Sequence, residues 1–304
     1  MERDTIRIGT RDSQLALWQA AQVLDAFVAQ GIAAELVPIK SEGDLDLSTP
    51  LYELGVQGIF TRTLDAALIA GRIDVAVHSM KDVPTRLARG LAEAAVLPRG
   101  PHQDILVPRK GIEFLDDASG VATIATSSTR RRAQWLHRYP NHGVENLRGN
   151  VNTRLKKLAD SDWKGAMFAA AGLERIGLRP QNAIDLDWIL PAPAQGAILV
   201  CCREEDAGTM EICKALHHHE TAICVRSERE FLRRLGGGCS TPIGALATIH
   251  DGTVRLQGNL FRPDGMAVID VIVEAQFDET DTLGPKAAES ILAQGGQTIL
   301  DAIH

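Results

Sequence analysis

Hydrophobic and polar positions alternate along the first hundred residues with two different periods. A two-residue period marks short strands, and apolar side chains at helical spacing from Leu15 to Phe27 mark a helix that follows the polar pair Asp12-Ser13. The elements predicted in this part are strands at 5–9, 33–39 and 73–77, helices at 15–27 and 60–70, and a polar loop at 40–50. This alternation predicts an α/β domain with an open, mostly parallel sheet, whose ligands lie beyond the carboxyl ends of the strands.

A second alternation begins at Asp104, and the pattern changes again near residue 217. It predicts strands at 104–107, 121–125, 144–147 and 166–170, helices at 128–138 and 152–159, and then one helix, strands at 243–249, 253–260 and 267–275, and a final helix at 282–302. Proline-rich segments at 98–101 and 191–193 predict two crossover linkers, and therefore a hinged pair of α/β domains followed by a small α+β domain. The expected domains are 1–98 with 192–214, 99–191, and 215–304.

Charge is distributed unevenly along the chain. The 304 residues include 32 basic and 39 acidic side chains, a formal net charge of −7, yet the segment from 120 to 180 holds eleven basic residues against four acidic ones. Most of the basic residues are arginines, whose planar guanidinium suits bidentate binding of a carboxylate or phosphate. An anionic ligand is the natural inference, and a solvated, salt-bridged surface is the alternative.

Several classes of protein are disfavoured by the sequence. No apolar run reaches the roughly 18 residues that a membrane span needs, and the charged start at Met1 lacks the hydrophobic stretch of a secretory signal, so we expect a cytoplasmic protein without a membrane partner. The five cysteines are odd in number and lack repeated CxxC spacing, which argues against disulfides and a zinc ribbon. We expect no metal site at His217–His219, because consecutive helical positions point about 100° apart.

Two segments place arginines beside polar helix caps. Thr126, Ser127 and Ser128 end a predicted strand and precede the arginines at 130–132, in the first turn of a helix. The helix dipole disfavours positive charge there by roughly 0.3 to 1 kcal/mol, so an anion is expected against these arginines. The segment 147–154 repeats the arrangement, with a glycine turn, a polar cap and two arginines. The two segments favour an anion-binding site over a solvated surface.

Asp82 follows a buried strand, where open α/β sheets place their chemistry. A surface ion pair with Lys81 is the alternative. A carboxylate would repel a bound anion, so we interpret Asp82 as the group that stabilises a cation or exchanges a proton.

Cys239 lies on the glycine-rich loop 236–242, unlike the other four cysteines, which lie in apolar patterns. A nucleophile, a redox sensor and a covalent attachment point remain open for this thiol.

Taken in order along the chain, these motifs resemble the porphobilinogen deaminase (hydroxymethylbilane synthase) family. The resemblance is carried by segments 8–16, 77–84, 126–131, 147–151, 170–173, 191–197 and 237–244. It implies two periplasmic-binding-protein-like α/β domains joined by a double crossover hinge, plus a small C-terminal α+β domain. It also implies a transferase that joins four porphobilinogen molecules head to tail, with loss of ammonia, onto a dipyrromethane cofactor attached to Cys239 by a thioether. Water then releases the linear tetrapyrrole hydroxymethylbilane.

The resemblance also implies roles for individual residues. Asp82 is the catalytic carboxylate, and the partners are porphobilinogen and the growing polypyrrole chain, without nucleic acid and in a monomer. The cofactor contacts that it implies come from Cys239, Lys81, Ser79, Thr126, Ser127, Ser128, Arg130, Arg131 and Gln195, and the substrate contacts from Arg11, Ser13, Arg148, Arg154 and Arg175. Each pyrrole carries two carboxylates, so the cationic segment is the complement that the chain of rings requires.

The sequence departs from the family pattern at Gln57, Arg62, Thr63 and Arg132. Gln57 removes one cation from the polar loop and Arg132 adds one, so we expect activity with altered substrate affinity. The rival hypothesis is a non-catalytic anion-binding protein of the same hinged architecture, which needs neither Asp82 nor Cys239. An RNA-binding role is weaker, because only 4% of the residues are aromatic.

Overall fold

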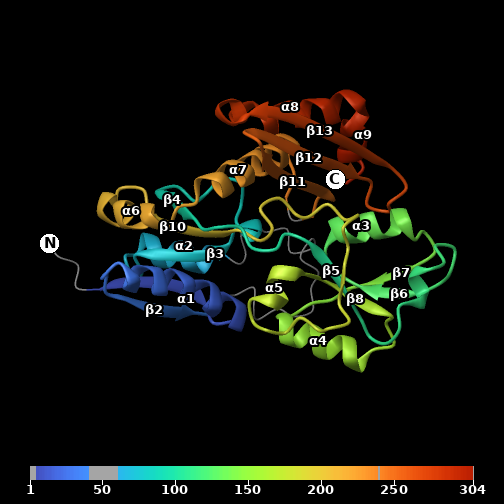
Figure 1. Cartoon of the computed structure of the whole chain (residues 1–304), viewed down its shortest axis with the longest axis horizontal. Coiled ribbons are helices and arrows are strands. Elements are labelled where there is room, and N and C mark those ends of the chain that lie inside the picture. Colours follow the sequence, from blue (N-terminus) through green and yellow to red (C-terminus); the bar gives the residue numbers. More distant parts are fainter. Residues whose placement is uncertain (1–4, 41–60, 239, 304) are drawn as a thin grey trace. The chain divides into compact units, whose positions relative to one another are not determined.

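The computed structural model describes residues 5–40, 61–238 and 240–303, which fall into two compact units. The first unit contains residues 5–40, 61–100 and 196–222, and the second contains residues 101–195, 223–238 and 240–303. Figure 1 shows the elements along the chain. The chain passes from the sheet of the first unit into the second unit after β4 (Leu91–Val96) and returns before β10 (Ile198–Arg203), so the predicted double crossover is confirmed.

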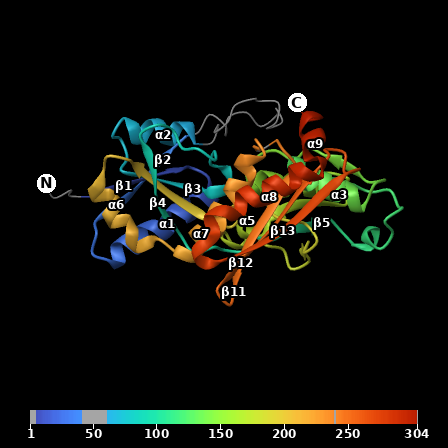
Figure 2. The same ribbon diagram turned by 90° about the horizontal axis from the view of Figure 1, so that it is seen from above.

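The first unit is a five-stranded sheet with helices on both faces. Its strand order is β2-β1-β3-β10-β4, and Figure 2 shows α1 and α2 on opposite faces of β1 and β3. The remaining bounds are β1 (Ile6–Arg11), β2 (Ala34–Ile39), β3 (Val75–Ser79), α1 (Gln14–Ala29), α2 (Arg62–Ile69) and α6 (Ala207–Cys213). Ile6, Ile8 and Val77 of the strands pack against Val23 and Phe27 of α1, which explains the helical spacing of apolar residues in this segment.

The second unit contains another five-stranded sheet, ordered β7-β6-β8-β5-β9. Its elements are β5 (Asp104–Pro108), β6 (Thr123–Ala125), β7 (Gly143–Glu145), β8 (Gly165–Ala169), β9 (Ile184–Asp185), α3 (Thr129–Arg138), α4 (Val151–Asp160) and α5 (Ala170–Glu174). Successive residues of β5 alternate between two cores: Ile105 packs on the side of Leu158 from α4, and Leu106 packs on the side of Trp135 from α3. Helices therefore cover both faces, as the fold class predicted.

The same unit ends in a three-stranded antiparallel sheet covered by helices. The elements are α7 (His219–Arg234), β11 (Ile243–His250), β12 (Thr253–Phe261), β13 (Val268–Gln276), α8 (Leu283–Ile291) and α9 (Gln297–Asp301). Short 3-10 turns lie at Met80–Asp82, Glu113–Leu115, Lys214–Leu216 and Phe277–Thr282. Phe231 of α7 is fully buried over Gly258 of β12, where a Cβ atom would come within 2.7 Å of its ring. This is the separate α+β element that the pattern predicted.

Two features of the predicted architecture are wrong. The sheets are mixed rather than mostly parallel, because β10 runs antiparallel to β3 and β4, and β5 runs antiparallel to β8 and β9. Both of these strands are the ones by which the chain enters a sheet from the other unit. The final helix is not continuous over 282–302: it is interrupted at Leu292–Gly296, where Gly295 has a φ of +93°.

The boundaries of the three expected domains stay a prediction. His217 and His218 precede α7, and the Nδ1 atom of His217 accepts a hydrogen bond from the Val96 amide. No group of three His, Cys, Asp or Glu side chains suited to a metal ion occurs within the described ranges.

None of the helices in the described part of the chain is long and apolar enough to cross a membrane.

His78 lies near the carboxyl end of β3 with only 6% of its surface exposed. Its Nε2 atom has no hydrogen-bond partner among the described residues. Burial, together with the positive charge of Arg11, lowers the pKa of the His78 imidazole to about 4. The folded unit therefore holds this histidine neutral at pH values at which the unfolded chain protonates it.

We predict that His78 makes the folded state lose stability as the pH falls. An unfolded histidine has a pKa of about 6.5, so between that pH and about 4 the unfolded chain binds the extra proton and stability falls by about 2 kcal/mol from pH 7 to pH 5. In His78→Gln, whose side chain does not titrate, this component should be absent. Urea unfolding of both proteins at several pH values measures the difference, and parallel pH profiles would contradict the assignment.

Candidate active site

The carboxyl ends of β1 and β3 bring several of the predicted residues of the first unit to one edge of its sheet. The two strands are parallel neighbours, with Ile8 opposite Val75, so their ends lie side by side. Arg11 is the last residue of β1, and Ser79 is the last residue of β3. Ser13 follows Arg11 as the N-cap of α1, where its hydroxyl accepts a hydrogen bond from the Ala16 amide at 3.4 Å.

Lys81 and Asp82 lie in the 3-10 turn directly after β3 and are half-buried. Two backbone hydrogen bonds fix this turn: the Met80 amide donates to the Ala197 carbonyl at 3.0 Å, and the Val83 amide donates to the Met80 carbonyl at 3.1 Å. Met80 itself is buried, which leaves its neighbours on the outer side of the turn. The structure thus holds the Asp82 carboxylate on a short, rigid turn at the strand edge.

The Ser79 hydroxyl is oriented by a residue that the sequence patterns do not single out. Gln19 of α1 is 2% exposed, and its Nε2 donates to Ser79 Oγ at 2.9 Å while its Oε1 accepts from the same hydroxyl at 3.1 Å. In the sequence, a glutamine among the apolar positions of an amphipathic helix indicates only an interruption of the apolar face. Its partner lies 60 residues away in the sequence, so no local signal identifies it.

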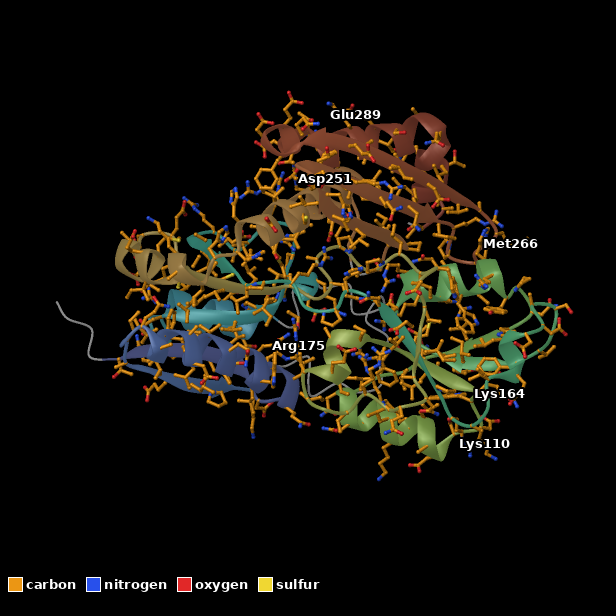
Figure 3. The ribbon with its side chains drawn as sticks, in the orientation of Figure 1. Lys110, Lys164, Arg175, Asp251, Met266 and Glu289 are labelled. Carbon is orange, nitrogen blue, oxygen red and sulfur yellow. The ribbon has the colours of Figure 1, made fainter. Side chains whose placement is uncertain are left out.

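The second unit gathers the other predicted residues in the same way. β6 is parallel to both β7 and β8, so the carboxyl ends of these three strands share one edge. Thr126, Ser127 and Ser128 follow β6, Arg148 follows β7, and Arg175 follows α5 beyond β8 (Figure 3). Burial lowers the pKa of the Arg175 guanidinium to about 10, so it remains charged at neutral pH.

Three hydroxyl groups shape the turn from β6 into α3. The Ser128 amide donates to Thr126 Oγ1 at 3.2 Å, and the Ser128 hydroxyl accepts from the Arg131 amide at 3.4 Å as the N-cap of the helix. The Ser127 hydroxyl accepts from the Leu147 amide at 2.8 Å and so ties this turn to the segment that carries Arg148. These contacts fix the positions of the first-turn amides of α3, which point away from the helix at its N-terminus.

The turn into α4 is fixed by similar contacts. The side chain of Asn150 caps the helix by accepting from the Thr153 amide at 2.9 Å, and Arg154 Nε donates to the Gly149 carbonyl at 2.7 Å. Gly149 has a φ of +111°, and a Cβ atom there would come within 2.7 Å of Thr153, so only glycine fits. Arg148, before this glycine, is 6% exposed.

Arg130 and Arg131 share a buried carboxylate, that of Asp104 at the start of β5. Arg130 Nη1 donates to Asp104 Oδ2 at 2.6 Å, while Arg131 donates to Asp104 Oδ1 from Nη2 at 2.6 Å and from Nε at 2.9 Å. All three residues are at most 6% exposed. Burial alone would raise the pKa of the Asp104 carboxyl, but the charges and hydrogen bonds of the two arginines outweigh it and hold that pKa well below its usual range.

Asp104 supplies part of the negative charge that the helix dipole and the cationic first turn of α3 require. The sequence predicts that cationic residues in the first turn of α3 need an anion, and the structure supplies one from within the chain. Arg132 points elsewhere: it is exposed, and its Nη1 donates to the Val144 carbonyl at 3.1 Å. Unfavourable charge by itself therefore does not require a bound ligand at this helix.

Donor groups nevertheless remain at this helix end. Within the described ranges, Arg130 Nε and Thr129 Oγ1 are buried atoms that have no hydrogen-bond partner. Burial lowers the pKa of the Arg130 guanidinium against the opposing effect of Asp104, which marks a charge that is incompletely compensated. A set of guanidinium, hydroxyl and amide donors with spare capacity fits a ligand that carries carboxylates.

Gln195 joins this cluster from the segment that leads back to the first unit. Its Nε2 donates to Asp104 Oδ1 at 3.0 Å and to the His102 carbonyl at 2.7 Å. The predicted set in the second unit is therefore brought together in part by Asp104, a residue that the motifs do not identify. Cys239 and Gln57 lie outside the described residues; across position 239, the Gly238 amide donates to Thr241 Oγ1 at 3.2 Å.

The remaining cysteines are Cys201, Cys202, Cys213 and Cys224, and all four are buried thiols, as expected. Burial raises the pKa of the Cys213 thiol to about 12, which leaves it unreactive. Arg62 and Thr63, two positions that depart from the family pattern, lie in the first turn of α2, where Arg62 is exposed.

Comparisons with known proteins cover nearly the whole chain. The family model described as "Porphobilinogen deaminase, dipyromethane cofactor binding domain" matches residues 6–232, and the model described as "Porphobilinogen deaminase, C-terminal domain" matches residues 222–293. Among solved structures, the periplasmic VFT2 domain of BvgS from Bordetella pertussis is 14% identical, with a TM-score of 0.44 over 72% of this chain and 89% of that one.

Two curated relatives are named Porphobilinogen deaminase. The protein of Syntrophotalea carbinolica is 43% identical, and the match covers 100% of this chain and 97% of the relative. The protein of Pelotomaculum thermopropionicum is 42% identical, with 99% of this chain and 97% of the relative covered. The chain therefore belongs to the porphobilinogen deaminase family and is a transferase of tetrapyrrole biosynthesis that carries a dipyrromethane cofactor.

Proposed function

We propose that this chain performs the family's reaction with Asp82 as its catalytic carboxylate and Cys239 as the attachment point of its cofactor. In that reaction four porphobilinogen molecules are condensed head to tail, and water releases the linear product hydroxymethylbilane. The observation that carries the residue assignment is the donor set at the start of α3, where Arg130 and Arg131 share the one carboxylate of Asp104 and, among the described residues, the buried Arg130 Nε and Thr129 Oγ1 have no hydrogen-bond partner. Such a set suits rings that each carry an acetate and a propionate.

The bound dipyrromethane supplies the free pyrrole carbon to which the first substrate is joined. We assign its thioether to Cys239 and its carboxylate contacts to Lys81, Ser79, Thr126, Ser127, Ser128, Arg130, Arg131 and Gln195. The contacts of the Ser128 cap and of Gln19 with Ser79 support these assignments, because they hold the hydroxyls in place before any ligand arrives. A preorganised site loses less entropy on binding than a flexible one.

The substrate side is assigned to Arg11, Ser13, Arg148, Arg154 and Arg175. Arg11 and Ser13 lie at the same strand edge as Asp82. In the second unit Arg148 follows β7, Arg154 lies in the first turn of α4, and Arg175 follows α5. Guanidinium groups bind carboxylates in two-point contacts, which fixes the orientation of a ring as well as its position. Orientation matters here because each condensation joins two particular carbon atoms.

Asp82 is assigned the proton chemistry. Each condensation breaks the bond between the substrate's aminomethyl carbon and its nitrogen, forms a carbon–carbon bond with the attacked pyrrole, and releases ammonia and one proton. Positive charge develops on pyrrole nitrogen during both bond changes, and a carboxylate on a fixed turn stabilises that charge and accepts a proton. A receptor that only binds anions would gain nothing from this carboxylate.

Other properties are part of the same proposal. We infer a cytoplasmic monomer of three domains that does not bind nucleic acid; three separate sheets and the low aromatic content support the last two points. The cation at Arg132 bonds to a backbone carbonyl of β7, which argues against a direct role of this residue in compensating for Gln57.

We predict that Asp82→Asn lowers kcat between about 100-fold and 10,000-fold, because the amide neither carries negative charge nor accepts a proton. Steady-state kinetics with porphobilinogen measures this loss, and circular dichroism and the melting temperature check the fold. Asp25→Asn, at an exposed position of α1 in the same unit, is the matched control and should keep wild-type kcat. Retention of most activity by Asp82→Asn would remove this residue from the mechanism.

We predict that Cys239→Ser carries only the mass of the unmodified polypeptide. The wild-type chain, and Cys224→Ala with a buried thiol removed, should instead carry the added mass of one dipyrromethane unit and gain pyrrole-sized increments after exposure to porphobilinogen. Intact-mass spectrometry after incubation with porphobilinogen reads both outcomes. An added dipyrromethane mass on Cys239→Ser would place the attachment at another residue.

A further inference from the structure

Asp104 is a fully buried carboxylate that no sequence motif assigns to the site. It is 0% exposed, and its two oxygens accept four hydrogen bonds, from Arg130, Arg131 and Gln195. These three partners come from α3 and from the crossover segment, and all three are residues to which we assign the cofactor's carboxylates. Asp104 is therefore buried and bonds the side chains that we assign to the cofactor.

The two arginines use Asp104 in different ways. Arg131 donates to Asp104 from Nε and Nη2 and to the Met167 carbonyl from Nη1, so every nitrogen of its guanidinium is engaged within the protein. Arg130 uses a single nitrogen, Nη1, for both Asp104 and the Leu190 carbonyl. Its Nε is buried and, among the residues described, has no partner. Arg131 thus bonds through all three of its nitrogens, whereas Arg130 keeps one entire nitrogen, Nε, without a partner among the described residues.

The charges of the cluster point to the kind of ligand. Two guanidinium groups and one carboxylate leave a single positive charge in a buried position. The N-terminus of α3, whose Ser128 cap lies two residues before Arg130, adds a partial positive charge on the same side. A single carboxylate of a ligand would neutralise the remaining positive charge and accept a hydrogen bond from Arg130 Nε.

The crossover segment is fixed by the same set of contacts. Leu190 accepts from Arg130 and exchanges two hydrogen bonds with the Gln134 side chain, at 2.8 and 3.0 Å. Ala194, which has a φ of +63°, donates its amide to buried Glu228 at 2.6 Å. The backbone that leads to Gln195 is therefore held in place, and the cluster is fixed before a ligand binds.

We propose that Asp104 is a positioning residue for the adjacent arginines of the cofactor site: it fixes Arg131 through Nε and Nη2, and it orients Arg130 so that Nε and the first turn of α3 bind one carboxylate of the cofactor. This inference rests on the proposed function, since it concerns a ligand of that site. A carboxylate with a merely structural role would stabilise the fold without affecting how much cofactor the chain takes up.

The test compares two buried aspartates that each bond two arginines, one in each unit. Asp74 in the first unit is 3% exposed and, like Asp104, bonds two arginines, Arg7 and Arg203. Asp104→Asn and Asp74→Asn each remove a carboxylate from such a cluster, and both should lower the melting temperature. After incubation with porphobilinogen, Asp104→Asn should show about a tenfold lower cofactor-loaded fraction by intact mass, while Asp74→Asn should load as the wild-type chain does.

A second pair of variants keeps the test decisive where Asp104→Asn does not fold. Arg130→Gln should lose more cofactor loading than Arg131→Gln, and Arg131→Gln, which removes two bonds to Asp104 and one to the Met167 carbonyl, should show the larger loss of melting temperature. Equal loading of Asp104→Asn and wild type, loss of loading by Asp74→Asn as well, or the reverse order of the two arginine variants would overturn the inference. A wild-type chain that takes up no dipyrromethane mass would instead overturn the proposed function.

Discussion

Two arginine side chains are buried side by side at the start of α3, and this is tolerable only because Asp104 neutralises one of their charges. The cluster connects three parts of the second unit, since Asp104 begins β5, the arginines begin α3, and Gln195 ends the crossover. A buried ion cluster with one charge left over is costly for a protein whose only task is to fold. The same arrangement is useful for a protein that binds an acidic ligand, because the hydrogen-bond donors are already aligned and desolvated.

Strand direction explains how residues far apart in the sequence reach common edges. β1 and β3 are parallel neighbours, as are β6, β7 and β8, so the segments after them emerge at one edge in each unit. The first edge carries the Asp82 carboxylate together with Arg11, Lys81 and two serine hydroxyls, and the second carries arginines and hydroxyls. A short turn holds Asp82, the N-cap of α3 holds the Ser128 hydroxyl, and the contact with Gln19 holds the Ser79 hydroxyl.

The sequence is enough to locate the strand ends, the capped helices α1, α3 and α4 and the small C-terminal sheet, because each depends on local periodicity or on a capping residue. It does not reveal that β5 and β10 run antiparallel, since strand direction depends on where the crossovers enter the sheets. The break at Gly295 depends on a positive φ that a glycine permits but does not require. The resemblance to a known family located the candidate residues that periodicity could not rank.

Asp104 illustrates the limit of pattern reasoning about the site. In the sequence it is an ordinary acidic residue before an apolar strand, 26 residues from Arg130, and nothing local marks it as the partner of two arginines. Gln19 was missed for the same reason. The helix dipole makes the cationic first turn of α3 unfavourable, as the sequence predicts, but part of the compensating negative charge comes from Asp104 of the chain itself and not from a ligand.

A crystal structure of the cofactor-loaded chain would test the central claim most directly. We expect one cofactor carboxylate within about 3 Å of Arg130 Nε and the first-turn amides of α3, with Arg131 still bonded to Asp104. A structure in which both arginines leave Asp104 to bind separate carboxylates, or in which no carboxylate lies at this helix end, would contradict the account.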